Sequence, residues 1–207
     1  MTPRLIAMLS VAAVIGIMGG LWLATNGGQD GDQFAQCRSS TVAGGAGAIG
    51  GPFELVNAQG ETVTDTEVIS EPSILYFGYT FCPDVCPLDV ARNAEAVDVL
   101  QEKGMSVTPV FISIDPERDT PEVVGDYAFY MHEKMIGLTG SPEQVKAASQ
   151  AYRTYYRAHE SDDEFYLVDH STFSYLVLPG HGFVEFFRRE TGSEDMANTV
   201  ACFVQNA

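Results

Sequence analysis

The sequence predicts an α/β protein in which helices flank one central mixed β-sheet, preceded by a single N-terminal transmembrane helix. Three observations predict this arrangement. Residues 5–24 are apolar and uncharged, and short apolar runs then alternate with segments of helical spacing. The chain has 207 residues, of which 45% are hydrophobic. This is enough for one well-packed core, and too little to make two large domains the expectation.

The N-terminal segment LIAMLSVAAVIGIMGGLWLA, residues 5–24, has the length of a membrane-spanning helix. The apolar part of a signal peptide is shorter, roughly 7 to 15 residues, so we expect an anchor; a signal peptide cleaved near Ala24 is the alternative. Arg4 is the only charge before Asp30. The positive-inside rule therefore places residues 1–4 in the cytoplasm and the rest of the chain across the membrane.

The short stretch before this anchor has no Arg-rich and Ser-rich presequence, which favours a bacterial plasma membrane over a mitochondrial inner membrane. We therefore expect a single-pass protein of the bacterial inner membrane whose domain faces the periplasm. Disulfides persist in such a compartment.

Residues 25–48 are rich in Gly, Ser and Ala without apolar periodicity, and they predict a flexible tether. The folded domain is expected over residues 49–207. It opens with GPFELVNAQGETVT, whose apolar residues alternate around an Asn-Ala-Gln-Gly turn, a pattern typical of a β-hairpin.

Buried strands and capped helices then alternate along the chain. The predicted strands cover residues 73–80, 107–115, 172–178 and 183–188, and the predicted helices cover residues 88–102, 120–135, 141–156 and 193–204. Thr120 and Ser141 are expected N-caps because a proline follows each of them. This order of elements is the thioredoxin-like arrangement, a mixed sheet with helices on both faces.

Cys82 and Cys86, in YFGYTFCPDVCP, fall between the first core strand and the first long helix. A helix N-terminus favours thiolate over thiol, so these cysteines are expected to be reactive. A purely structural bridge is the less favoured alternative, since closing so short a loop removes little entropy from the unfolded chain. Three residues separate the cysteines, which suits two metal ligands as well as a redox pair, and the spacing alone leaves both open.

A metal site would need a further ligand, and His170 is the strongest candidate among the four histidines. It leads into the strand predicted from Thr172, at the sheet end that carries the cysteines. A lone histidine beside a strand is more often structural than a ligand. The other histidines are expected to be surface or packing residues: His132, His159 and His181.

Three motifs in this order, CPDVCP (82–87), SIDPERDTP (113–121) and VDHS (168–171), resemble those of the Sco/SenC family of membrane-anchored copper chaperones for cytochrome c oxidase assembly. The resemblance covers about residues 49–204. It implies that Cys82, Cys86 and His170 bind copper, as Cu(I) and Cu(II), with one ion per chain.

The donor set is compatible with this implication. Two thiolates and one imidazole suit Cu(I), whereas structural zinc almost always takes four ligands. Asp115 is a candidate carboxylate for orienting His170, and a turn-capping role in DPERDTP is equally expected. Asp84 is expected to present its carboxylate toward a partner.

Cys37 and Cys202 lie outside these motifs. In an oxidising compartment they are candidates for a structural disulfide between the tether and the last helix. Sequence alone does not fix this pairing.

Two functions from different classes remain. The first is a metallochaperone, not an enzyme, that delivers copper to the CuA site of cytochrome c oxidase subunit II. The alternative is a thiol-disulfide reductase that uses Cys82 and Cys86 to keep the cysteines of that CuA site reduced. A peroxide-reducing thioredoxin relative has the least support, because its nucleophilic cysteine would not need His170.

The formal charge of −17 argues against nucleic acid as a partner and is compatible with a basic protein partner. The acidic run from Glu160 to Glu164 is expected to steer such a partner toward His170. Candidate partners besides subunit II are a c-type cytochrome, a thioredoxin-like reductant and an upstream copper donor.

Overall fold

A computed structural model describes residues 14–22, 32–40, 42, 45–159 and 165–207, and the chain divides into two units, Met1–Ala35 and Gln36–Ala207. In the first unit, residues 14–22 form a helix. The rest of the segment predicted to span the membrane, together with residues 1–4, lies outside the described residues. Among the helices of the described part, none is both long enough and apolar enough to cross a membrane. The anchor over residues 5–24 therefore stays a prediction.

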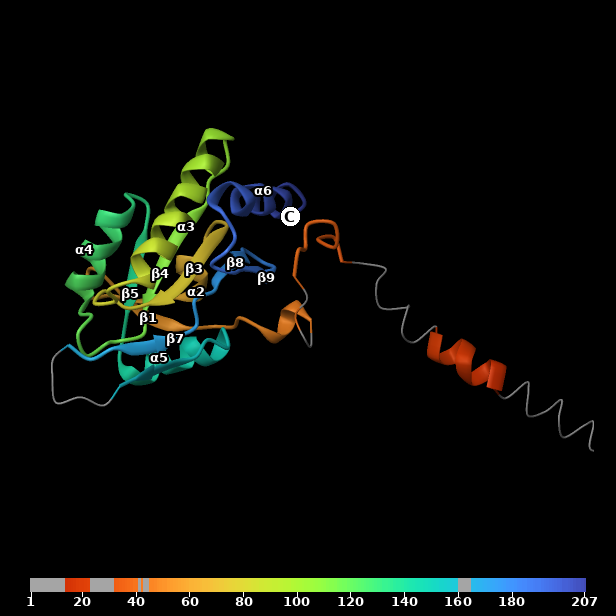
Figure 1. The fold of residues 1–207 in the computed structure, drawn as a ribbon, viewed down its shortest axis with the longest axis horizontal. Helices are drawn as coiled ribbons and strands as arrows, with labels where there is room; N and C mark the ends of the chain where they lie inside the picture. Colours follow the sequence, from red (N-terminus) through yellow and green to blue (C-terminus); the bar gives the residue numbers. More distant parts are fainter. Residues whose placement is uncertain (1–13, 23–31, 41, 43–44, 160–164) are drawn as a thin grey trace, which may run out of the picture. The chain divides into compact units, whose positions relative to one another are not determined.

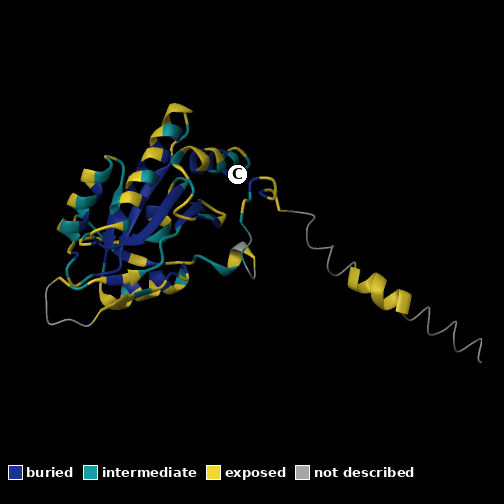
Figure 2. Cartoon of the chain, viewed as in Figure 1, coloured by how far each residue is buried: buried dark blue, intermediate teal, exposed yellow. Residues whose placement is uncertain are grey.

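The second unit is built on a seven-stranded mixed sheet with the order β2-β1-β5-β4-β3-β8-β9 (Figure 1). Its strands are β1 (Glu54–Asn57), β2 (Thr62–Thr64), β3 (Ser73–Gly78), β4 (Thr108–Ser113), β5 (Ile136–Thr139), β8 (Ser174–Leu178) and β9 (Gly182–Phe187). The central strands β3, β4 and β5 run parallel, and β1 and β8 pair with them antiparallel. Every residue of β3 and β4 is buried, as Figure 2 shows in dark blue, because helices cover both faces of a parallel core.

Helices pack on both faces of this sheet, as the sequence predicts. They are α2 (Asp65–Val68), α3 (Val85–Glu102), α4 (Pro121–Met131), α5 (Pro142–Ala151) and α6 (Ser193–Gln205), with a short 3-10 helix η1 (Ala46–Ala48). Figure 1 shows α3, α4 and α6 on one side of the sheet and α5 on the other. The side chains of Thr120 and Ser141 cap α4 and α5 by accepting from the backbone N–H groups of Val123 and Gln144. The thioredoxin-like fold is therefore confirmed.

Three short strands were not predicted. The helix predicted over residues 120–135 ends at Met131 and is followed by β5. The helix predicted over residues 141–156 ends at Ala151 and is followed by β6 (Tyr156–Ala158). This strand pairs with β7 (Val168–His170) in a separate two-stranded sheet. His170 is thus the last residue of β7 and does not lie in a loop before β8.

The tether predicted over residues 25–48 is too long, because its residues 36–40 belong to the compact second unit. We call residues 36–40 the N-terminal strap. A disulfide joins Cys37 to Cys202 of α6, with Cα atoms 5.6 Å apart. The backbone N–H of Ser39 donates at 2.9 Å to Glu185 of β9, a carboxylate that is 1% exposed. The Ser40 hydroxyl donates to the same carboxylate. The domain therefore begins near residue 36 instead of residue 49.

Candidate metal centre

Cys82 and Cys86 lie where β3 gives way to α3. The helix begins at Val85, three residues earlier than the predicted start, so Cys86 is in its first turn. The backbone N–H of Cys86 donates to Sγ of Cys82 at 3.3 Å. The unpaired N–H groups of a helix start therefore face a sulfur that can carry negative charge. Cys82 is 9% exposed and Cys86 is 0% exposed, so an incoming group reaches Cys82 first.

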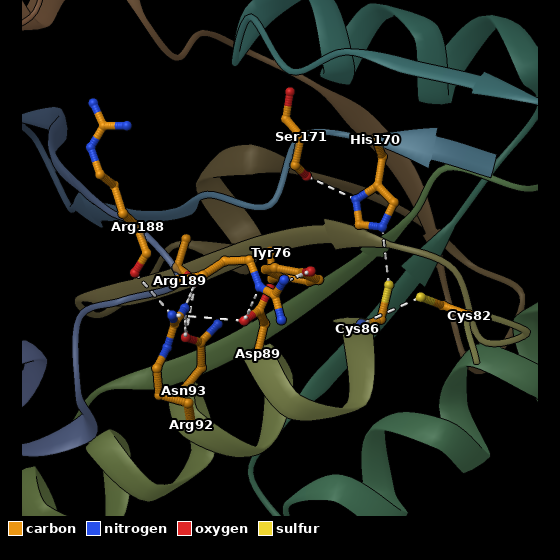
Figure 3. Close-up of polar contacts among 11 residues, drawn as sticks. Tyr76, Cys82, Cys86, Asp89, Arg92, Asn93, His170, Ser171, Arg188 and Arg189 are labelled. Carbon is orange, nitrogen blue, oxygen red and sulfur yellow. Dashed lines mark hydrogen bonds and ion pairs between the residues drawn. The ribbon is translucent and has the colours of Figure 1, made fainter. Parts of the chain in front are cut away.

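His170 faces the two cysteines from β7, as Figure 3 shows. Its Nε2 atom lies 3.3 Å from Sγ of Cys86. Its Nδ1 atom lies 2.8 Å from the carbonyl oxygen of Ser171, and we assign the ring proton to Nδ1 from this contact. The ligand atoms of Cys82, Cys86 and His170 all lie within 4.8 Å of one another. The fold thus brings together the three residues that the sequence singled out.

The two cysteine thiols differ in acidity. The hydrogen bond from the Cys86 thiol, together with the backbone N–H groups of Asp84 and Cys86, lowers the pKa of Cys82 to about 3, against the opposing effect of burial. The same hydrogen bond and the burial of Cys86 raise the pKa of Cys86. Of the two thiols, Cys82, which accepts from the start of α3, is therefore the more acidic.

Two tyrosines of β3 and its following loop form the wall behind the imidazole. The rings of Tyr76 and Tyr79 meet the ring of His170 edge-on, with centroids 6.2 and 5.8 Å away. The hydroxyl of Tyr79 also accepts from the backbone N–H of Val168 at 3.3 Å, which holds β7 beside the cysteine loop. Between these tyrosines, Gly78 leaves room for the site, since a Cβ there would lie 2.9 Å from Sγ of Cys86.

A buried carboxylate lies one helical turn after Cys86. Asp89, which is 3% exposed, accepts from the hydroxyl of Tyr76 at 3.0 Å (Figure 3). Its other oxygen lies 3.3 Å from Nε of Arg189 and 3.8 Å from Nη1 of Arg92. Burial raises the pKa of Tyr76, which keeps its hydroxyl protonated as a donor. No local pattern in the sequence predicts this network, because its members come from β3, α3 and the segment after β9.

The structure gives Asp115 partners other than His170. Its carboxylate, 4% exposed, accepts from Nε of Arg118 at 2.5 Å and from the hydroxyl of Tyr166 at 2.6 Å. The orientation of His170 is set by the Ser171 carbonyl instead. The backbone carbonyl of Asp115 accepts from the N–H of Arg118 at 3.2 Å, which is a contact of the backbone and not of the carboxylate. Asp84 is the N-cap residue of α3 and is exposed, and its role toward a partner stays a prediction.

Asp119 supports the cysteine loop and was not singled out from the sequence. It is 0% exposed and accepts from the backbone N–H of Thr80 at 3.0 Å, from the Thr80 hydroxyl at 2.5 Å and from Ser113 at 2.6 Å. Burial raises its pKa. The available signal was its place in SIDPERDTP, where it follows the buried strand β4.

The other histidines lie apart from the cysteines. His132 contacts Asp98 at 3.3 Å, His159 contacts Asp169 at 2.9 Å, and His181 is exposed in the turn between β8 and β9. The acidic run over residues 160–164 lies outside the described residues. Within the part of the chain that the structure describes, Cys82, Cys86 and His170 are the group of His, Cys, Asp or Glu residues spaced to hold a metal ion.

A thioredoxin-like fold that places two sulfurs and one imidazole nitrogen beyond a core strand defines a protein with a soft metal-binding or dithiol site. The chain belongs to the SCO1/SenC family, whose pattern matches residues 42–205. It is 50% identical to Protein SenC of Rhodobacter capsulatus over 203 residues, which are 98% of this chain and 90% of that protein.

Two solved structures are similar in fold and sequence. Arabidopsis thaliana ScoI with copper bound is 44% identical, with a TM-score of 0.72, over 76% of this chain and 99% of that one. Yeast Sco1 with copper bound is 34% identical, with a TM-score of 0.72, over 77% of this chain and 90% of that one. The predicted family resemblance is confirmed.

Proposed function

We propose that this protein binds one copper ion, as Cu(I) or Cu(II), through Cys82, Cys86 and His170, and delivers it to the CuA site of cytochrome c oxidase subunit II. The observation that carries the proposal is the convergence of three ligand atoms within 4.8 Å from segments 84 residues apart. The copper-bound structures of the Arabidopsis and yeast relatives support copper as the metal.

The donor set favours copper over zinc. Two thiolates and one imidazole are soft or borderline ligands that suit Cu(I), and Cu(II) is bound by the same atom types. Structural zinc almost always takes four protein ligands, and the described residues add no fourth His, Cys, Asp or Glu to this group. A three-ligand site leaves a coordination position for a thiolate of the recipient, which can bind copper before the bonds to the donor break.

The sequence and the disulfide support a periplasmic setting for the domain. In this proposal residues 5–24 anchor the chain in the bacterial inner membrane and the domain faces the periplasm. The Cys37–Cys202 disulfide suits an oxidising compartment. Subunit II is the proposed recipient, and a c-type cytochrome, a thioredoxin-like reductant and an upstream copper donor are the further partners.

A reductase function is the second candidate, and the Cys82 thiolate favours it. Cys82 would attack a disulfide of the partner and release one partner thiolate. Cys86 would then lose its proton and displace the second partner thiolate, which leaves a Cys82–Cys86 disulfide and a reduced partner. The two functions differ in their need for His170, which takes no part in this exchange.

The test uses the intact reduced chain beside two variants, His170→Ala and His132→Ala. We expect one copper per wild-type chain, with Cu(II)–thiolate absorption that His170→Ala loses and His132→Ala keeps. His132 is the matched control because its imidazole contacts Asp98 and lies outside the ligand group. A wild-type chain that holds no copper against a modest competitor, and whose dithiol reduces a test disulfide, would replace the chaperone with the reductase.

A further inference from the structure

Arg118 lies between the two segments that carry the proposed ligands. It belongs to the turn after β4, and its side chain is 12% exposed. Its role is not explained by the ion pair with Asp115 alone, because the same guanidinium contacts aromatic side chains from both segments.

On the side of the cysteines, the guanidinium contacts two rings of the loop that ends at Cys82. Its Cζ atom lies 5.0 Å from the ring centroid of Phe81 and 5.6 Å from that of Tyr79. Both distances are within the range of a cation–π contact. Phe81 is the neighbour of Cys82 in the chain, and the backbone carbonyl of Tyr79 accepts from the N–H of Cys82 at 3.2 Å. The guanidinium therefore packs directly against the loop that presents the first sulfur.

On the side of the histidine, the guanidinium contacts Tyr166, four residues before His170. Its Cζ atom lies 3.6 Å from the ring centroid of Tyr166, and its Nη1 atom donates to the backbone carbonyl of Tyr166 at 2.9 Å. A stacked ring and a bonded carbonyl hold both the side chain and the backbone of this residue.

The buried carboxylate of Asp115 holds Arg118 and Tyr166 together. One oxygen accepts from Nε of Arg118 at 2.5 Å, and the other accepts from the hydroxyl of Tyr166 at 2.6 Å. The planar fork of an arginine satisfies a carboxylate, a carbonyl and a ring face together, which the point charge of a lysine does not.

We propose that Arg118 is a positioning residue, which clamps the segment of Tyr166 to the cysteine loop and so sets the separation between Nε2 of His170 and the two sulfurs. The effect on copper binding rests on the proposed function, whereas the clamp between the two segments does not depend on it. Thiolates alone hold Cu(I) well, and Cu(II) depends more on the nitrogen ligand. Arg118 therefore raises the affinity of the site for Cu(II) more than its affinity for Cu(I).

The test compares the intact wild-type chain with Arg118→Lys, which keeps the charge, and with Phe81→Leu, which removes one stacked ring. Arg38→Lys is the matched control, since Arg38 also lies over a ring, that of Phe203 in α6, and donates to the Val184 carbonyl. The first readout is amide hydrogen exchange without metal. The second is the affinity for Cu(II) and for Cu(I), with the Cu(II)–thiolate spectrum.

We expect exchange at residues 166–170 to be faster in Arg118→Lys and Phe81→Leu, with β3 unchanged. The Cu(II) dissociation constant should rise about 10- to 100-fold in Arg118→Lys, the usual cost of losing support around a metal ligand, and the Cu(I) constant by less than about threefold. The control should match the wild type in both readouts.

Unchanged exchange at residues 166–170 would refute the clamp. Faster exchange with an unshifted spectrum and unchanged Cu(II) affinity would refute the positioning role. A wild-type chain without copper affinity would refute the proposed function, and the exchange comparison would still decide the clamp.

Discussion

Nδ1 of His170 lies 2.8 Å from the carbonyl oxygen of Ser171, and this contact determines which ring nitrogen faces the sulfurs. With the proton on Nδ1, Nε2 keeps its lone pair toward Cys86, 3.3 Å away. In this tautomer Nε2 presents its lone pair to a metal held by the two sulfurs. The orienting group is a backbone carbonyl, so the tautomer does not depend on the charge of a neighbouring carboxylate.

Alkylation of Cys82 in the metal-free chain should be nearly independent of pH. Because the pKa of Cys82 is lowered to about 3, its thiolate is fully populated above about pH 5 and is lost only as the pH falls through that pKa. An ordinary thiol with a pKa of about 8.5 would react several hundred-fold faster at pH 8 than at pH 5. Iodoacetamide labelling followed by mass spectrometry measures this, and a rate that rises tenfold per pH unit would contradict it.

Gly78→Ala should destabilise the domain and weaken copper binding. The new Cβ would lie 2.9 Å from Sγ of Cys86, 2.9 Å from the ring of Tyr76 and 3.1 Å from that of Phe111. Overpacking of this kind costs about 1–3 kcal/mol, measured by urea unfolding. Gly47→Ala is the control, since nothing lies within 4 Å of its Cβ position. Equal stability of both variants would show that the site tolerates a side chain there.

Asp119→Asn should loosen the cysteine loop. The buried carboxylate accepts three hydrogen bonds from Thr80 and Ser113, and an amide replaces one acceptor oxygen with a donor. We expect a loss of about 1–3 kcal/mol in the free energy of unfolding and faster alkylation of Cys86, which is otherwise 0% exposed. Unchanged stability together with an unreactive Cys86 would mean that the loop is held by other contacts.

Removing the Cys37–Cys202 disulfide should destabilise the domain by about 3–5 kcal/mol, because it closes a loop with a sequence separation of 165 residues. The double variant Cys37→Ser/Cys202→Ser tests this in urea unfolding. A reductant should destabilise the wild type and leave the double variant unchanged, which separates this bridge from effects on Cys82 and Cys86. Recovery of Cys37 and Cys202 as two free alkylated peptides from unreduced protein would contradict the pairing.

The sequence predicts the parts of the fold that carry a local signal. The capped starts of α4 and α5 and the apolar runs of β3 and β4 were recognised because residues close in sequence specify them. The strands β5, β6 and β7 were missed because each has only three or four residues. So short a segment shows no period of its own, and its partner is chosen by tertiary packing.

The residues of the candidate site also differ in whether a local sequence signal predicts them. The cysteines were placed by the helix that starts between them, and the family motifs added His170 as a ligand. For Asp115 the sequence left two roles open, orienting His170 and capping a turn. Its contacts with Arg118 and Tyr166 were not predicted, because they join residues up to 51 positions apart. The sequence of one segment does not show which distant aromatic side chain will contact it in the fold.

The pairing of Cys37 with Cys202 determines which thiols of the chain remain free. The chain has four cysteines, and two of them are consumed in this bridge. The two free thiols, Cys82 and Cys86, both belong to the candidate metal centre. A thiol titration of the unreduced protein after unfolding in urea therefore carries no background: two equivalents report a reduced dithiol, and none reports an oxidised pair.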